Sequence, residues 1–345
     1  MSGARAGRGT GPGSCVGSAD VGATRIAFLG PRGTFCEQAL RSLTPDEARA
    51  AGLDRDAETV PATSTTAALD AVRRGEAAAA CVPIESSVEG AVPATMDGLV
   101  EAPPLVVVRE ILLPVRFAVL VRPGTTADAV RTVASHPHGE AQTRRWLAEH
   151  LPRAEVRMTP STAAAAAEVA AGGVDAAVCA AVAAGHYGLD VLVDGVHDTG
   201  DAVTRFVVVR APGTPPAPTG SDRTSLAATT ANEPGALLAL LAEFALRGVD
   251  LTRIESRPSK ARLGTYWFFL DGAGHVSEPA MGEALAGARR RAVEFRYLGS
   301  YPRAVVPAGS TAPSPPVATP TPGQTAADHE AAARWLTGVR AGEHA

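Results

Sequence analysis

Lysine is nearly absent from this sequence, since Lys260 is its only lysine and all other basic residues apart from histidine are arginines. Enzymes that hold a carbonyl substrate or pyridoxal phosphate as a Schiff base need a lysine amine in the site. Lys260 stands in a stretch that reads as a hairpin turn, and the lysine-containing loop that cradles nucleotide phosphates is missing too. We therefore expect neither Schiff-base nor phosphate-loop chemistry.

Paired cysteines are absent as well. Cys15, Cys36, Cys81 and Cys179 are far apart in the chain, and none belongs to a Cys-x-x-Cys pair. No histidine stands at the spacing of a zinc ligand set, and no disulfide framework is indicated. The sequence predicts free thiols and no metal site.

A basic block and a long apolar run are also missing. The 345 residues carry a formal net charge of -4 at pH 7, which gives no long-range attraction to nucleic acid or anionic lipid. No apolar span approaches the length of a membrane helix, and the first residues do not read as a secretory signal. We expect a cytoplasmic protein without a nucleic-acid or membrane partner.

Composition divides the chain into segments. The start is rich in Gly, Ser and Arg, a Pro/Gly stretch interrupts the middle, and a Pro/Thr/Ser-rich stretch comes near the end, followed by a short amphipathic patch that a loose helix would fit. The predicted segments are a disordered extension (1–23), a first domain (24–210), a linker (211–222), a small second domain (223–303) and a mostly disordered tail (304–345).

The two predicted domains differ in rhythm. Between residues 24 and 210, short apolar runs alternate with helical periodicity, which predicts α/β structure with a largely parallel sheet. We expect two α/β lobes with a cleft between them, the second lobe covering about 112–180. Residues 223–303 follow the order βαββαβ, which is typical of a ferredoxin-like domain.

Two helix starts carry polar residues. Thr34 stands three residues before Glu37, just after Gly33, and Ser86 stands three residues before Glu89. Both pairs fit a capping box, so Thr34 and Ser86 either cap helices only or also face a ligand. Sequence alone leaves the two interpretations equal.

A third helix start follows Ser135 and His136, one of which precedes Pro137 at the first helical position. Helices that begin at the carboxyl ends of parallel strands point unpaired N–H groups into the crevice of an open α/β sheet. Several such ends facing one cleft favour an anionic ligand, most simply a carboxylate.

The stretch "GDAVTRFVVVR" reads as a buried strand that begins with Thr204 and Arg205. Neighbouring strand residues point to opposite faces, so we expect only Thr204 to face the cleft. Arg205 has two interpretations: it binds a substrate carboxylate, or it is held by carboxylates of the sheet or of the loop with Asp198 and Asp201.

Six motifs occur in one order between residues 25 and 301: "FLGPRGTF", "VPIESSVEG", "SHP", "VTRF", "GALL" and "IESRP". Together they resemble the monofunctional prephenate dehydratases with a C-terminal ACT domain. The resemblance implies a two-lobed fold like that of periplasmic binding proteins and conversion of prephenate to phenylpyruvate, CO2 and water, without a cofactor. It also implies inhibition by L-phenylalanine at the ACT domain and a homodimer or homotetramer.

The resemblance also implies roles for single residues. Thr204 falls on the catalytic threonine of the family, and Ser135 and Gln142 fall on hydrogen-bonding groups of the substrate site. The proposed substrate site comprises Ser86, Ser135, Gln142, Arg205, Gly33 and Thr34. The proposed phenylalanine site comprises Gly235, Ala236, Leu237, Leu238, Asp250, Leu251, Glu255, Ser256, Arg257 and Pro258.

Three positions depart from the family pattern. Ser86 replaces the usual Asn of the substrate site and lacks its amide donors, so a substrate hydrogen bond is lost or bridged by water. Cys36 replaces a usual Ser. Asp250 replaces an Asn beside the effector site, where a second carboxylate weakens binding of phenylalanine's own carboxylate.

These departures keep two alternatives open. One is a preference for arogenate, which has an amino group in place of the side-chain keto group of prephenate. The other is a non-catalytic protein that senses amino acids with the same fold.

Overall fold

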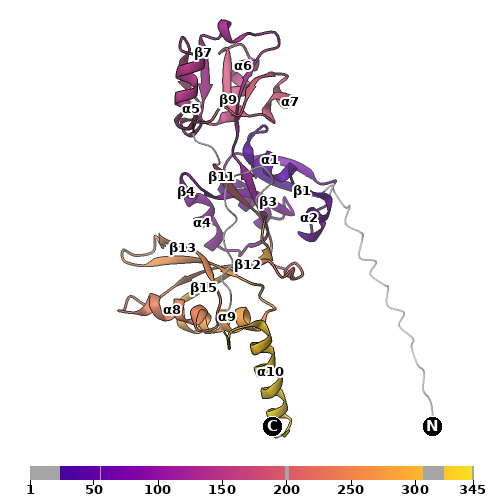
Figure 1. Ribbon diagram of the computed structural model, residues 1–345, viewed down its shortest axis with the longest axis vertical. Helices are drawn as coiled ribbons and strands as arrows, with labels where there is room; N and C mark the ends of the chain where they lie inside the picture. Colours follow the sequence, from indigo (N-terminus) through magenta and orange to yellow (C-terminus); the bar gives the residue numbers. More distant parts are fainter. Residues whose placement is uncertain (1–23, 55, 199–201, 306–321, 344–345) are drawn as a thin grey trace, which may run out of the picture.

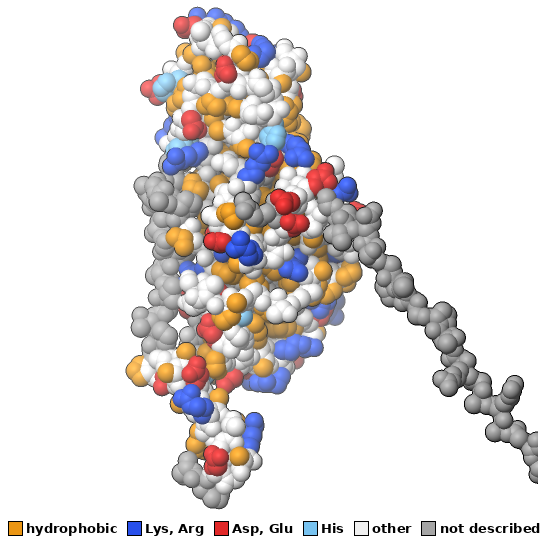
Figure 2. Space-filling model, turned by 90° about the vertical axis from the view of Figure 1, so that its right-hand side faces the viewer, with side chains coloured by type: hydrophobic (Ala, Val, Ile, Leu, Met, Phe, Trp, Pro, Cys, Tyr) orange, Lys and Arg blue, Asp and Glu red, His pale blue; other side chains and the backbone are white. Residues whose placement is uncertain are grey.

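The computed structural model describes residues 24–54, 56–198, 202–305 and 322–343, so the extension at 1–23 lies outside the described residues. Three sheets follow one another along the long axis of the molecule, with the second lobe at the top of Figure 1, the first lobe in the middle and the small domain below. On the face shown in Figure 2, acidic and basic side chains are interspersed with apolar and polar ones. This fits the small net charge.

The first lobe is a 6-stranded mixed sheet in the order β2-β1-β3-β11-β5, with β4 beside β3. Its strands are β1 (Arg25–Leu29), β2 (Glu58–Ala62), β3 (Ala79–Ser86), β4 (Gly90–Ala91), β5 (Val106–Pro114) and β11 (Val203–Arg210). Its helices are α1 (Phe35–Arg41), α2 (Pro45–Ala50), α3 (Thr65–Arg73) and α4 (Pro93–Val100).

The second lobe is a 5-stranded sheet in the order β10-β6-β9-β7-β8. Its strands are β6 (Phe117–Val121), β7 (Thr132–Ser135), β8 (Glu155–Met158), β9 (Ala176–Ala180) and β10 (Asp190–Asp194). Its helices are α5 (Pro137–His150), α6 (Thr162–Ala170), α7 (Ala183–Tyr187) and the short 3-10 helix η1 (Ala127–Ala129).

The path of the chain explains why both sheets are mixed. The chain leaves the first lobe after β5, builds the second lobe, and returns as β11, which pairs antiparallel with both β3 and β5. In the second lobe β6 is antiparallel to β9 and β10. The prediction of largely parallel sheets is therefore correct only for β1–β3 and β7–β9. The sheet of the second lobe also continues past residue 180, to the end of β10.

The small domain has the predicted ferredoxin-like order. Its elements are β12 (Asp222–Thr229), α8 (Ala236–Ala245), β13 (Leu251–Pro258), β14 (Tyr266–Ala273), α9 (Pro279–Arg291) and β15 (Glu294–Pro302). The sheet order is β13-β14-β12-β15, and each neighbouring pair is antiparallel.

A last helix, α10 (Ala326–Arg340), extends away from the small domain (Figure 1). This helix is the amphipathic patch that a loose helix was expected to fit. Thr325 and Asp328 form a reciprocal capping box at its start, and the helix is rich in alanine, the strongest helix former.

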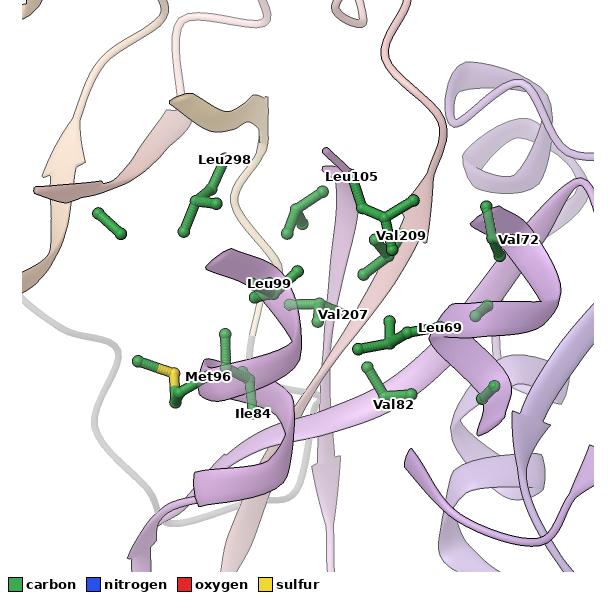
Figure 3. Packing of buried hydrophobic residues seen from close by; sticks show 14 of the residues in the cluster. Leu69, Val72, Val82, Ile84, Met96, Leu99, Leu105, Val207, Val209 and Leu298 are labelled. Carbon is green, nitrogen blue, oxygen red and sulfur yellow. The ribbon is translucent and has the colours of Figure 1, made fainter. Parts of the chain in front are cut away.

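One apolar core passes from the first lobe into the small domain. Figure 3 shows Leu69, Val82, Met96, Leu99 and Val207 of the lobe packed in one cluster with Leu298 of β15. Other members from the small domain are Ala227, Trp267, Phe269 and Tyr301.

The backbones of the two domains also approach closely. Gly299 of β15 has φ +126, and a Cβ there would lie 2.1 Å from the carbonyl oxygen of Val107 in β5. Glycine is therefore required at the point where the two sheets touch.

Within the described ranges, no helix is both long and apolar enough to cross a membrane. The same residues contain no group of three or more His, Cys, Asp or Glu side chains placed to hold a metal ion.

Candidate active site between the lobes

The return strand β11 places Thr204 beside Ser86. The two residues are register partners in the antiparallel pair of β11 and β3, and Leu113 of β5 is the partner of Thr204 on the other side. Thr204 is half-buried, and its hydroxyl has no hydrogen bond to any described residue. The Thr204 hydroxyl is therefore available to a substrate at the edge where β11 enters the sheet.

Arg205 points away from this edge and is buried, with a side chain only 6% exposed. Its guanidinium lies 2.6 Å from Asp271 of β14, 2.7 Å from Glu110 of β5 and 2.8 Å from the hydroxyl of Tyr301. Burial opposes its charge, but Asp271, Tyr301 and Glu110 more than compensate and raise its pKa well above the usual value. Arg205 thus joins the first lobe to the small domain, and we leave it out of the proposed substrate site.

A β-bulge lies next to this pair of strands. The register shifts between Arg205 and Phe206, whose partners on β3 are Glu85 and Pro83, so Ile84 is the extra residue. Bulges re-aim side chains and are common beside active sites. Here the bulge sets the directions of Glu85 and Ser86 at the end of β3.

Ser86 does not begin a helix, and that prediction is wrong. Its hydroxyl accepts hydrogen bonds from the backbone N–H groups of Val88 and Glu89 at 3.3 and 3.4 Å, within the turn from β3 to β4. The Ser-x-x-Glu pattern fits this turn as well as a helix start. The carboxylate of Glu89 instead lies 2.8 Å from Nδ1 of His138, across the gap between the lobes.

Thr34 caps α1 as predicted, because its hydroxyl accepts from the N–H of Glu37 at 3.4 Å. The hydroxyl also donates to the carbonyl of Leu29 at 3.0 Å. The reciprocal bond of a capping box is displaced by one residue, since the Glu37 carboxylate accepts from the N–H of Gly33 at 2.6 Å. The Thr34 side chain is thus engaged in its own helix start.

Glu37 is a residue that sequence reasoning credited only with capping. Its carboxylate is fully buried, lies 2.7 Å from Arg41, and meets Nε2 of His186 in the second lobe at 3.0 Å. Gly33 has φ +86, and a Cβ there would lie 3.0 Å from the Cβ of Ala183. Glu37 and Gly33 therefore bring the two lobes into contact at α1 and α7.

Two further contacts support this junction. Phe35 and Phe117 meet edge to face with their ring centres 5.3 Å apart. The hydroxyl of Tyr187 donates to the carbonyl of Arg32 at 3.2 Å. Burial, with smaller contributions from Cys179 and Glu37, raises the pKa of Tyr187, so this hydroxyl stays a neutral donor.

His136, rather than Ser135, caps α5. Its Nδ1 accepts from the N–H of His138 at 3.3 Å, and burial together with His138 lowers its pKa, which favours the neutral ring that a cap requires. Ser135 is completely buried and donates to the carbonyl of Val178 at 3.1 Å. The structure thus places the Ser135 hydroxyl beneath α5 instead of at its exposed end.

Gln142 is half-buried on α5, and its backbone is tied to the segment that leads toward β11. The N–H of Asp198 donates to the carbonyl of Gln142 at 2.8 Å. The carboxylate of Asp198 accepts from the N–H groups of Arg145 and Trp146, each at 2.8 Å. Asp198 therefore binds the backbone of α5, whereas the sequence had offered it as a partner of Arg205. Sequence reasoning missed this positioning role, because such an insertion into the hydrogen bonds of a helix leaves no local pattern.

The predicted effector residues fall on two ends of the small domain. Gly235 caps α8 in the left-handed conformation with φ 81, and Leu238 in its first turn is 71% exposed. Strands β12 and β13 run in the same direction, because each is antiparallel to β14. Gly235 and Pro258 therefore lie at one end of the sheet, and Asp250 and Leu251 lie at the other.

The surroundings of these effector residues also differ. Asp250 lines a cavity of about 260 Å³ together with Val249, Glu278 and Met281. Arg257 of β13 forms a two-point ion pair with Asp97 of α4, at 2.8 and 3.2 Å. In one chain the predicted effector residues thus do not form a single site.

The fold and this inter-lobe site define a class of protein, namely a two-lobed α/β domain of the periplasmic-binding-protein type joined to a ferredoxin-like domain. A family model described as prephenate dehydratase matches residues 26–214. The chain belongs to the prephenate dehydratase family.

Relatives cover nearly the whole chain. A protein named prephenate dehydratase from Mycobacterium marinum is 47% identical over 324 residues, which are 92% of this chain and 96% of that protein. One of the same name from Amycolatopsis methanolica is 50% identical and covers 93% of this chain and 100% of its own length.

Solved structures agree in fold. A prephenate dehydratase from Arthrobacter aurescens, described as a complex with L-Phe, is 40% identical with a TM-score of 0.79 and covers 92% of this chain and 99% of its own. GqqA, described as a novel type of quorum quenching acylase, is 32% identical with a TM-score of 0.72 and covers 81% of this chain and 98% of its own. Because a protein described with another activity shares this fold, the fold alone does not define the activity. The sequence identity of nearly 50% over almost the full length carries more weight.

Proposed function

We propose that this chain converts prephenate to phenylpyruvate, CO2 and water, with the substrate held between the lobes beside Thr204. The observation that carries the proposal is the 47–50% identity to proteins named prephenate dehydratase over 92–93% of the chain. The free hydroxyl of Thr204 at the edge of β11 supports the position of the site.

The reaction makes few chemical demands on the protein. The bond from the ring to its carboxylate breaks, its electron pair enters the ring, and the ring C–O bond breaks as the ring becomes aromatic. The departing hydroxide takes up one proton and leaves as water. The protein supplies orientation, a hydrogen bond or proton for the hydroxyl, and partial desolvation of the carboxylate.

Thr204 acts in this proposal as a hydrogen-bond donor to the departing hydroxyl, or relays a proton to it, because an alcohol is itself a poor acid. Ser86 and Gln142 complete the substrate contacts from β3 and α5. The N-terminal ends of α1 and α5 favour the carboxylates of the substrate. Ser135 and Thr34 support these helix starts from within the protein.

Inhibition by L-phenylalanine belongs to the same proposal. The relative from Arthrobacter aurescens, described as a complex with L-Phe, supports it. Gly235 and Asp250 lie at opposite ends of the small domain, so one chain alone does not bring them together. We therefore propose a homodimer or homotetramer in which the phenylalanine site is shared between chains, in the cytoplasm and without a cofactor.

The test is steady-state formation of phenylpyruvate from prephenate by the purified protein, with and without phenylalanine and in the presence of a chelator. We expect turnover that ignores the chelator and falls as phenylalanine is added. A higher kcat/KM with arogenate than with prephenate would identify arogenate as the preferred substrate. A folded protein that turns over neither compound would overturn the proposal in favour of a binding protein.

A further inference from the structure

Strand β13 of the small domain reaches the end of β3 through Arg253. The Nε atom of Arg253 lies 3.3 Å from the carboxylate of Glu85, and its Nη2 lies 3.7 Å from the sulfur of Met96 in α4. The Arg253 side chain is only 8% exposed, whereas that of Glu85 is 38% exposed, so solvent reaches the pair from the Glu85 side. Glu85 therefore has a cationic partner in the other domain.

A second arginine of the same strand contacts the same part of the first lobe. Arg257 and Lys260 both bind the carboxylate of Asp97 in α4, with the Lys260 nitrogen at 2.7 Å. Burial opposes the Asp97 charge, but the hydrogen bonds from Arg257 and Lys260 prevail and lower its pKa. Strand β13 thus holds both the end of β3 and the helix that follows the β3–β4 turn.

Glu85 occupies the last position before Ser86. Its register partner is Arg205, whose guanidinium lies 3.7 Å from its carboxylate, while the next pair in the register joins Ser86 to Thr204. Beyond the bulge at Ile84, Glu85 and Ser86 pair with both β11 and β4. Glu85 therefore lies next in the chain to Ser86 and one register position from Thr204.

The surrounding interface contains one rigid part and one open part. The apolar cluster in Figure 3 and the bonds between Arg205 and Asp271 fix the centre of the interface. Beside them lies a cavity of about 270 Å³, lined among others by Glu85, Val203 and Arg253. Arg253 and Glu85 have room to move there while the centre holds.

We propose that Glu85 is a positioning residue for the reaction and that Arg253 is the contact by which the small domain controls it. When an effector binds along β13, Arg253 changes its hold on Glu85, and Ser86 and Thr204 move with the end of β3. This inference rests on the proposed function. It adds the contacts within one chain that link the predicted effector residues of β13 to the site between the lobes.

The test compares Arg253→Met with Arg253→Lys, which keeps the charge, and with Arg290→Met on the exposed surface of α9. For each variant, kcat and KM for prephenate are measured with and without saturating phenylalanine, and calorimetry gives the dissociation constant of phenylalanine. Allosteric coupling typically changes affinity by roughly 5- to 150-fold. We expect Arg253→Met to bind phenylalanine like the wild type and yet lose most of its inhibition, Arg253→Lys to retain part of it, and Arg290→Met to match the wild type.

Glu85→Gln is expected to lower the kcat measured in the absence of phenylalanine. Its dissociation constant for phenylalanine should change less, because a variant that still binds phenylalanine is folded and has lost only the positioning of the site. Adding Arg253→Met to Glu85→Gln should change inhibition little further, because contacting residues of one route are not additive. Full inhibition of a folded Arg253→Met variant overturns the inference and leaves the proposed function intact. A wild type that turns over prephenate but ignores phenylalanine overturns the inference together with the proposed inhibition, and leaves the proposed reaction intact.

Hydrogen exchange gives a readout that needs no turnover. Phenylalanine should change the protection of residues 82–97 in the wild type and in Arg290→Met, and not in Arg253→Met. An equal change in Arg253→Met overturns the inference even if the enzyme proves inactive on prephenate.

Discussion

The guanidinium of Arg205 lies 2.6 Å from the carboxylate of Asp271, and this bond joins the strand that carries Thr204 to the second domain. Asp271 also accepts from Ser225 at 2.6 Å, and it lies 3.5 Å from Arg223. Only 4% of the Asp271 side chain is exposed. Charges so far from water are tolerated only when they are paired, so each partner depends on the other.

We predict that Asp271→Asn lowers the free energy of unfolding by about 3–5 kcal/mol. The substitution removes one of the two buried carboxylates that Arg205 and Arg223 share, so Glu110 alone faces both guanidinium groups. Urea unfolding followed by tryptophan fluorescence measures the change. Asp46→Asn is the matched control, since Asp46 pairs with Arg49 on the surface with its side chain 88% exposed, and its effect should stay within about 0.5 kcal/mol. Equal effects of the two substitutions would contradict the prediction.

The Asp271 carboxylate also makes the free energy of unfolding depend on pH in acid. Burial alone would raise the pKa of Asp271, but Arg205, Arg223 and Arg253 outweigh it and lower the pKa below its usual range. Because the pKa of Asp271 is lower in the folded than in the unfolded protein, its ionised carboxylate stabilises the fold. This stabilisation is complete above the unfolded pKa of about 3.9 and is lost as the pH falls through the folded pKa. The difference in unfolding free energy between wild type and Asp271→Asn should be constant from neutral pH to about pH 5 and shrink below about pH 4. A difference that already falls between neutral pH and pH 5 would show that another group titrates.

Removing the Thr204 hydroxyl tests the proposed chemistry. Thr204→Ala should lower kcat by about 10²- to 10⁴-fold, the usual contribution of a positioned proton-transfer group. Thr204→Ser keeps the hydroxyl and should retain most of the activity. Both variants should unfold at the wild-type temperature, because Thr204 is half-buried and its hydroxyl bonds to no described residue. Near-normal turnover by Thr204→Ala would remove Thr204 from the mechanism.

Restoring an amide at position 86 tests the alternative that the protein only binds ligands. Ser86 accepts two N–H groups of its own turn, so a substrate contact at this position uses the remaining capacity of one hydroxyl. If the wild type is an enzyme, Ser86→Asn should raise kcat/KM by no more than about tenfold, the worth of one additional hydrogen bond. A rise of several orders of magnitude from almost no turnover would favour the binding protein.

Asp198 should matter through Gln142. Asp198→Ala removes the two charged acceptors of the Arg145 and Trp146 N–H groups, and such hydrogen bonds contribute about 1.5–3 kcal/mol each. Helix α5 can then form its own backbone hydrogen bonds at these N–H groups, which shifts Gln142. We therefore expect KM for prephenate to rise more than kcat falls. Asp194→Ala is the control, because the Asp194 carboxylate is exposed and, among the described residues, accepts only from the N–H of Gly195. A variant that loses kcat alone would argue against a role in substrate binding.

The sequence supported the order of elements better than their pairing. Periodicity and caps predicted α1, α5 and the βαββαβ order, because these depend on nearby residues. The antiparallel return of β11 depends on where a long excursion of the chain ends, and no local pattern records that. Ser86 was misjudged because a tight turn and a helix start offer the same N–H groups to a serine oxygen.

Long-range partners were equally hidden. Nothing around Arg205 indicates Asp271, which lies 66 residues away in another domain. The sequence did correctly predict that Arg205 and Thr204 point to opposite faces, since successive side chains alternate in any strand. The contact of Glu37 with His186 arises only once the lobes are assembled.

The continuous core between the first lobe and the small domain has a consequence for how the protein melts. With Leu298, Trp267 and Phe269 packed among the side chains of Figure 3, neither part buries its apolar surface alone. Both should unfold in one cooperative transition, and a chain cut in the linker would present a bare hydrophobic face to water. Removing the small domain would therefore also remove part of the core of the first lobe.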